Sequence, residues 1–75
     1  MRGTPRIFVG TVTLRVDGPR GRLAAEAVRE EVARLPGVRV LAVDAAAGTV
    51  SVTAHLPVDR GDVVAALERA GCRVR

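Results

Sequence analysis

The chain has 75 residues, of which 48% are hydrophobic, and its 12 basic and 8 acidic side chains give a formal net charge of +4. This length supports one domain with one modest core. No stretch approaches the roughly 18 consecutive apolar residues of a membrane span, and no signal-peptide pattern is present, so we expect no membrane insertion and a cytoplasmic location.

The chain has a single cysteine, and arginine is its only type of basic residue apart from one histidine. The single cysteine, Cys72, cannot form a disulfide within the chain, which fits a reducing compartment. Every basic residue is Arg, whose planar guanidinium suits pairing with carboxylate or phosphate groups. The positive charge is compatible with acidic partners without requiring them.

The first half of the chain predicts a strand followed by a helix. Residues 1–6 are polar and contain Gly and Pro, so we expect a flexible N-terminal arm before a single domain at 7–75. From Phe8 to Val16 apolar and polar residues alternate, as in a half-buried strand. From about Arg22 to Leu35 the apolar residues recur on one face, which predicts a surface helix with one buried stripe.

A hairpin is predicted next. Pro36-Gly37 ends the first helix, because Pro cannot continue it and Gly permits the turn. Val38–Val43 and Thr49–Ala54 have the composition of strands, and Asp44–Gly48 forms the turn between them.

The last third predicts a second helix and a short strand. Asp59 is placed as the N-cap, and Val58 and Val63 as a hydrophobic staple across the first turn. Gly71 ends the helix, and Cys72–Val74 form the final strand.

The order of these elements is βαββαβ, which predicts a ferredoxin-like α+β fold. We expect a four-stranded antiparallel sheet with both helices on one face, the third strand between the first and second, and the fourth beside the first. This topology places the turn after the first strand, the Asp44–Gly48 hairpin and Cys72 at one end of the sheet. His55 lies at the other end.

The stretch from Thr11 to Val74 resembles the heavy-metal-associated domain, a family that includes small copper chaperones and the N-terminal domains of metal-transporting P-type ATPases. The similar parts are Leu35-Pro36-Gly37-Val38, the hairpin from Val43 to Val52, Pro57-Val58-Asp59 and Glu68-Arg69-Ala70-Gly71. The resemblance implies the ferredoxin-like fold. It also implies docking on partner domains through the face around the family's metal loop.

The family's metal site is the part of the resemblance that this chain lacks. Family members carry Met-x-Cys-x-x-Cys after the first strand, and the two thiolates hold Cu(I) or a similar soft metal. Aligned with that run, this chain has Pro19 at the Met position and Gly21 and Ala24 at the two cysteines, while Gly18 is retained. No metal ligand carries over, so we expect no cofactor.

The leading hypothesis is a divergent heavy-metal-associated domain without the CxxC ligands that acts as a small protein-interaction module. Its predicted contacts with a partner or anion are Gly18, Arg20, Gly21 and Arg22, in the turn between the first strand and the first helix. The expected partner is an acidic protein surface, on a metal pump domain or within a larger assembly. We expect a monomer or a weak dimer.

Two alternatives remain open. In the first, Cys72 binds Cu(I) or Zn(II) at a site shared across a dimer, and the nearby turn lowers the thiol pKa. The competing interpretation is that Cys72 is a small apolar residue at the start of a strand. In the second, the guanidinium groups of Arg20 and Arg22 and the N–H groups of the helix start bind an anion.

Catalysis and nucleic-acid binding are not predicted. No Ser/His/Asp or Cys/His grouping is expected at one end of the sheet, and an ion pair with an arginine of the turn accounts for Asp17 and Asp44. His55 is interpreted as a solvent-facing residue at a strand end. Bases would have only Phe8 on which to stack, and it is expected on the core face. We therefore expect that the chain is not an enzyme.

Overall fold

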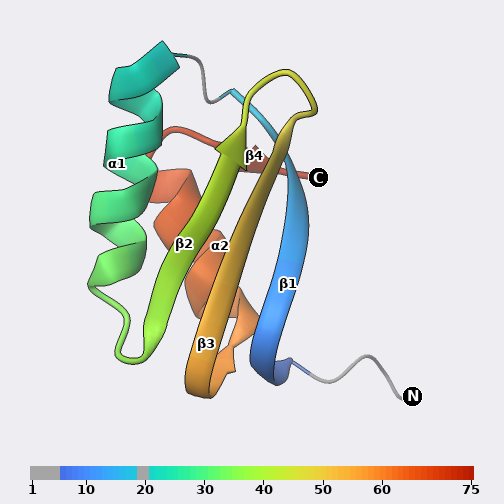
Figure 1. Ribbon diagram of the computed structural model, residues 1–75, viewed down its shortest axis with the longest axis vertical. Helices are drawn as coiled ribbons and strands as arrows, with labels where there is room; N and C mark the ends of the chain where they lie inside the picture. Colours follow the sequence, from blue (N-terminus) through green and yellow to red (C-terminus); the bar gives the residue numbers. More distant parts are fainter. Residues whose placement is uncertain (1–5, 19–20) are drawn as a thin grey trace.

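The computed structural model describes residues 6–18 and 21–75, which form a sheet with both helices on one face (Figure 1). The elements in chain order are β1 (Ile7–Asp17), α1 (Gly21–Ala33), β2 (Val38–Asp44), β3 (Thr49–Asp59), α2 (Arg60–Arg69) and β4 (Arg73–Val74). The strands pair antiparallel in the order β2-β3-β1-β4. The predicted ferredoxin-like fold and its strand order are confirmed.

The core lies between the sheet and the helices and consists of small aliphatic side chains. Alternation along β1 and β3 turns one set of residues toward the helices and leaves the other set on the open face of the sheet. Phe8 packs against this core while remaining partly exposed. The fully buried members are Val28, Val32, Val50, Val52, Val63, Ala66 and Leu67.

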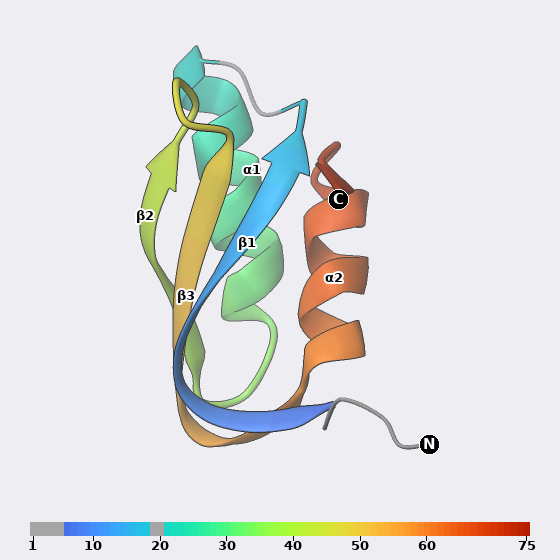
Figure 2. The same ribbon diagram turned by 90° about the vertical axis from the view of Figure 1, so that its right-hand side faces the viewer.

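β3 extends beyond its predicted end because its pairing with β1 resumes after an interruption, and β1 gains Ile7 opposite Asp59 and Asp17 opposite Arg73. One register runs from Arg15 opposite Thr49 to Gly10 opposite Ala54. It then shifts, so that residues 55–57 of β3 bulge out before pairing resumes. Gly10 accommodates the bend in β1 with a φ of 104°. The bend carries the start of β1 and the end of β3 under the helices (Figure 2).

The first helix is shorter than the sequence pattern predicts. α1 ends at Ala33, and Leu35, the predicted last residue, lies in the turn that follows. The N–H of Leu35 donates to the carbonyl of Val32 at 2.9 Å, a tighter turn than the α-helix makes. The cause is Pro36, because a proline disfavours the helical conformation of the residue before it.

The second helix begins as predicted. Asp59 is the N-cap, and its Oδ1 accepts a hydrogen bond from the N–H of Gly61 at 2.8 Å. Val58 and Val63 are both buried, as the staple requires. Gly71 follows the C-cap with a φ of 97°, a left-handed conformation that ends the helix.

The N-terminal arm lies mostly outside the described residues. Arg6, which the sequence assigns to the arm, contacts the start of α2: the N–H of Arg60 donates to its carbonyl at 2.6 Å. Its Nε also lies 3.7 Å from Oδ1 of Asp59. Within residues 6–18 and 21–75, no helix is long and apolar enough to cross a membrane.

Candidate functional site

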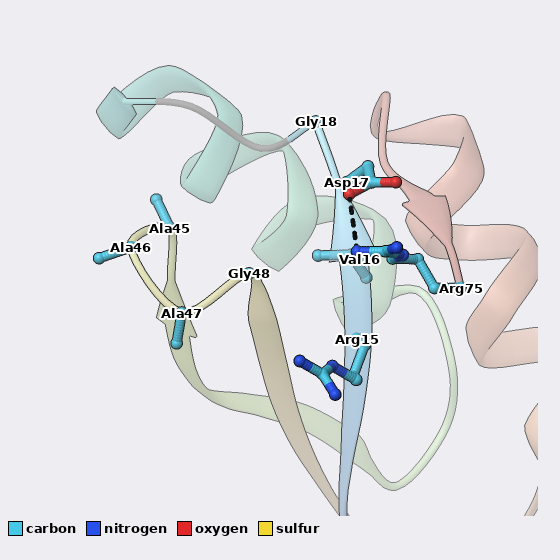
Figure 3. Close-up of a pocket in the computed structure, with 9 residues that line it drawn as sticks. All are labelled: Arg15, Val16, Asp17, Gly18, Ala45, Ala46, Ala47, Gly48 and Arg75. Atoms are coloured by element: carbon cyan, nitrogen blue, oxygen red, sulfur yellow. Dashed lines mark ion pairs between the residues drawn. The ribbon is translucent and has the colours of Figure 1, made fainter.

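Three segments meet at one end of the sheet: the end of β1, the hairpin between β2 and β3, and the residues that follow β4 (Figure 3). Backbone hydrogen bonds join them. The N–H of Val16 donates to the carbonyl of Gly48 at 2.8 Å, and the N–H of Arg75 donates to the carbonyl of Arg15 at 2.9 Å. The predicted approach of the start of the β1–α1 turn to the hairpin is therefore present, and Arg75 joins them.

The segments enclose an open depression of about 460 Å³. Its hairpin wall presents backbone and methyl groups, and its β1 side presents two guanidinium groups. Arg15 points to the hairpin side of β1, and the side chain of Arg75 reaches toward Asp17 (Figure 3). The lining residues are Arg15, Val16, Asp17, Gly18, Ala45, Ala46, Ala47, Gly48 and Arg75.

The balance of charge in the depression is positive. Oδ1 of Asp17 lies 3.6 Å from Nη1 of Arg75, and both side chains are more than half exposed. Such exposed ion pairs contribute about 0–1 kcal/mol, so Arg75 remains available to a stronger acceptor. Among the described residues Arg15 has no ion-pair partner.

The two acidic residues near the turn each have a partner among the described residues. Asp17 pairs with Arg75, and Oδ1 of Asp44 accepts a hydrogen bond from the N–H of Ala47 at 3.0 Å, which closes the hairpin turn. The expected ion pair with Arg20 or Arg22 falls on side chains outside the described residues and stays a prediction. Both acidic groups therefore have structural roles.

The four predicted contact residues lie at the junction of β1 and α1. Gly18 follows β1 and lines the depression, while Gly21 and Arg22 begin α1. Arg20 and the side chain of Arg22 lie outside the described part of the structure. Contact of these four residues with a partner or an anion stays a prediction.

Gly18 also has a packing role. Its φ is 112°, and a β-carbon built there would lie 2.9 Å from the carbonyl oxygen of Gly71. The same β-carbon would lie 3.7 Å from Cα of Cys72. Only a glycine lets the end of β1 approach the start of β4 this closely.

Cys72 lies near this end of the sheet, but its side chain belongs to the core. It is 4% exposed and packs within the buried cluster between sheet and helices. Burial raises the pKa of the thiol, because desolvation disfavours the thiolate. The metal-binding alternative expects the opposite direction. In the described residues, no three His, Cys, Asp or Glu side chains form a group that could hold a metal ion.

His55 lies at the opposite end, as predicted. It is exposed in the bulge of β3, and its N–H donates to the carbonyl of Gly37 at 2.9 Å. It lies within the observed β3, which continues to Asp59. A second open depression of about 280 Å³ lies beside it, next to the turn that follows α1. The topology therefore separates His55 from Cys72.

The sequence alone does not identify Arg15 and Arg75 as site residues. Alternation places Arg15 on the open face of β1, but nothing local indicates that it meets the chain's last residue. The strand order indicates that they are neighbours, because β4 runs antiparallel beside β1 with Val74 opposite Val16. Continuing that register by one residue sets Arg75 opposite Arg15, and their hydrogen bond agrees.

No protein-family model matches the chain, and no curated protein matches it by sequence. Similar solved structures include the N-terminal domain of PacS from Synechocystis PCC6803, which is 29% identical, with a TM-score of 0.71 over 87% of this chain and 92% of that one. They also include a putative copper-ion-binding protein from Bacillus anthracis strain Ames, which is 31% identical. Its TM-score is 0.66, over 92% of this chain and 96% of that one. The chain therefore belongs to the heavy-metal-associated domain family.

Proposed function

We propose that this chain is a divergent heavy-metal-associated domain that lacks the two-cysteine ligands and acts as a small protein-interaction module. It docks through the face around the β1–α1 turn. The described part of this face, here called the loop-end surface, consists of residues 15–18, residues 45–48 and Arg75. The proposal rests on one observation: the described residues that line the depression present two guanidinium groups, the carboxylate of Asp17, and methyl and peptide groups, but no thiol.

The side chains available as metal ligands argue against binding of a soft metal ion. Gly21 and Ala24 stand where the resemblance places the family's cysteines. The chain's single thiol, Cys72, is buried, and its pKa is raised. Soft ions need thiolate or thioether ligands, and the guanidinium groups of the depression repel cations.

The chemistry of the partner follows from the charge. The chain carries a net charge of +4, and the guanidinium of Arg15 has no ion-pair partner within the described residues. A carboxylate is the acceptor that fits a guanidinium group, often through two parallel hydrogen bonds. The partner is therefore an acidic protein surface, on a metal pump domain or in a larger assembly in the cytoplasm.

Binding of a small anion is the second candidate function, because Arg15 and Arg75 line the same depression. It predicts that phosphate raises the midpoint of thermal unfolding. The rise should disappear in Arg20→Ala with Arg22→Ala if the turn holds the anion. It should disappear in Arg15→Ala with Arg75→Ala if the depression does.

The test of the interaction function is a titration of the 15N-labelled chain with hexaglutamate, followed through its amide NMR signals. We expect saturable shifts at Gly18 and Ala45–Gly48 and their loss in Arg15→Glu with Arg75→Glu. The matched control is Arg34→Glu with Arg39→Glu, which makes the same change in charge at exposed positions away from the depression. Equal weakening by both double variants, or no saturable shift, would contradict the proposal.

A further inference from the structure

The second depression, beside His55, lies at the end of the sheet opposite the loop-end surface. Figure 1 shows the turn between α1 and β2 at this end, away from the hairpin between β2 and β3. The depression, here called the bulge-end depression, has a volume of about 280 Å³ and is lined by Ala33, residues 35–39 and His55. It shares no lining residue with the loop-end surface, so the two can be tested separately.

Two irregularities of the backbone meet at the bulge-end depression. Gly37, in the turn after α1, has a φ of 76°, a left-handed conformation that favours glycine. Across from it is the bulge of β3, where the N–H of His55 donates to the carbonyl of Gly37 at 2.9 Å. A β-carbon at Gly37 would lie 2.9 Å from Cβ of Leu56, in the same bulge. The glycine therefore lets the turn and the bulge approach each other, and the depression lies beside this contact.

Most of the side chains that line the bulge-end depression are apolar. Val38 is buried, Leu35 is partly buried against the core, and Pro36 is exposed. Leu56, which lies against Gly37, is 48% exposed. Removal of apolar surface from water is favourable, so this end of the sheet favours contact with an apolar group.

The charge around the bulge-end depression has a single sign. Its lining residues come from the segments 32–43 and 45–58, which contain no Asp or Glu. The ionisable side chains of these segments are Arg34, Arg39 and His55. Neither arginine has an ion-pair partner among the described residues. A carboxylate is therefore the group that complements this surface.

We propose that the bulge-end depression binds one large apolar side chain of a partner protein, with acidic residues beside it in the partner's sequence pairing with Arg39 and Arg34. The size of the depression favours a protein over a small molecule. Pockets for drug-sized ligands measure about 300–1,000 Å³ and enclose most of the ligand, whereas this depression is smaller and open. It suits a single anchoring side chain. This second contact surface goes beyond the loop-end interaction and uses none of its residues.

A second copy of the chain does not offer this combination of an apolar anchor and adjacent carboxylates. The large apolar side chains that are exposed among the described residues are Ile7, Val9, Leu41 and Leu56. None of the four has an Asp or Glu within two positions in the sequence, and two of them have an arginine that close. Insertion of one of them from a second copy would bring arginines together, so the occupant is a different protein.

The test uses the 15N-labelled full chain and an acetylated, amidated pentapeptide that carries leucine between two pairs of glutamates. We expect saturable shifts of the amide signals of Gly37, Val38 and His55. The same peptide with alanine in place of leucine should bind at least roughly tenfold more weakly, because it lacks the anchoring side chain. Absence of saturable shifts with the leucine peptide, or equal affinity for the two peptides, overturns the proposal.

Arg39→Glu tests the charged part of the bulge-end depression. The matched control is Arg29→Glu, which makes the same change in charge at an exposed position of α1 that lines neither depression. We expect affinity for the leucine peptide to fall at least roughly tenfold in Arg39→Glu relative to Arg29→Glu. Equal affinity in the two variants overturns the proposal. If Arg39→Glu does not fold, Arg39→Gln removes only the charge and should still weaken binding, and unchanged affinity overturns the proposal.

Further outcomes separate the bulge-end depression from other surfaces and other occupants. Shifts with the leucine peptide confined to Gly18 and residues 45–48 would overturn this proposal and leave the loop-end interaction intact. Absence of the hexaglutamate response there, with the leucine peptide still shifting Gly37 and His55, would do the reverse. Binding of N-acetylleucine as tightly as the peptide would assign the depression to a small carboxylate and overturn the proposal. Shifts of Gly37 and His55 that grow with protein concentration alone would assign it to a second copy, which also overturns the proposal.

Discussion

Gly18 lies directly against the backbone of Gly71, so closely that a β-carbon at Gly18 would stand 2.9 Å from the Gly71 carbonyl oxygen. This contact joins the end of β1 to the turn that precedes β4. The two residues are far apart in the sequence, and both have positive φ angles. Their approach positions the β1 side of the depression relative to the chain's last residues.

The first prediction concerns this contact. Gly18→Ala should lower the free energy of unfolding by about 2–4 kcal/mol, because it adds a steric clash to a left-handed backbone conformation. Gly71→Ala should lower it by only about 1–2 kcal/mol, because its β-carbon would have no atom within 4 Å. Urea unfolding of both variants measures the difference. Equal losses would show that the close approach contributes nothing.

The second prediction concerns the start of α2. Asp59→Ala should destabilise the fold by about 1 kcal/mol, because the N–H of Gly61 loses its acceptor. Asp62→Ala, in the same helical turn, removes only a favourable charge near the helix start and should cost about 0.3–1 kcal/mol. Asp59→Asn keeps the acceptor and should be close to wild type. A larger effect of Asp62→Ala would contradict the capping assignment.

The third prediction is a pH dependence that arises from Cys72. Burial raises the pKa of its thiol above the ordinary value of 9.0, so the folded state holds the proton more tightly than the unfolded state. Below that value both states are protonated and stability is unaffected. As pH rises above it, the unfolded state ionises first, and stability should fall by at most about 1.4 kcal/mol per pH unit until the folded-state pKa is passed.

The composition allows the effect of the Cys72 thiol to be measured without other side chains that titrate in the same pH range. The chain has no Tyr and no Lys, so Cys72 is the side chain expected to titrate between the histidine and arginine ranges. Urea unfolding at pH 8 to 10.5 should give a declining stability for the wild type and a flat profile for Cys72→Ala. A decline of equal slope in both proteins would show that the thiol is not its source.

Periodicity and turn chemistry predict most of this fold. Asp59, Gly71 and Pro36-Gly37 each act locally, so their roles in starting and ending helices follow from the sequence. The end of α1 was misplaced because the apolar pattern continues to Leu35 although Pro36 interferes with it. The length of β3 was missed because the bulge at residues 55–57 interrupts the alternation on which strand prediction depends.

The candidate site is less predictable because it depends on contacts between distant segments. Gly18 is identifiable from the resemblance, but its packing against Gly71 requires the register of β4 on β1. Arg15 and Arg75 come together only through that register. Cys72 was expected in the final strand but precedes β4, which begins at Arg73. Its burial depends on how the turn after α2 packs between the sheet and the helices, which no local pattern in the sequence indicates.

We propose that the chain interacts with proteins and carries no soft metal at the positions of the family's thiolate site. The decisive measurement is a titration of the fully reduced protein with Cu(I) in the presence of a competing chelator, followed by native mass spectrometry. We predict no stoichiometric copper complex for the wild type or for Cys72→Ala. A complex of one ion per chain or per pair of chains that forms with the wild type and disappears in Cys72→Ala would contradict the account.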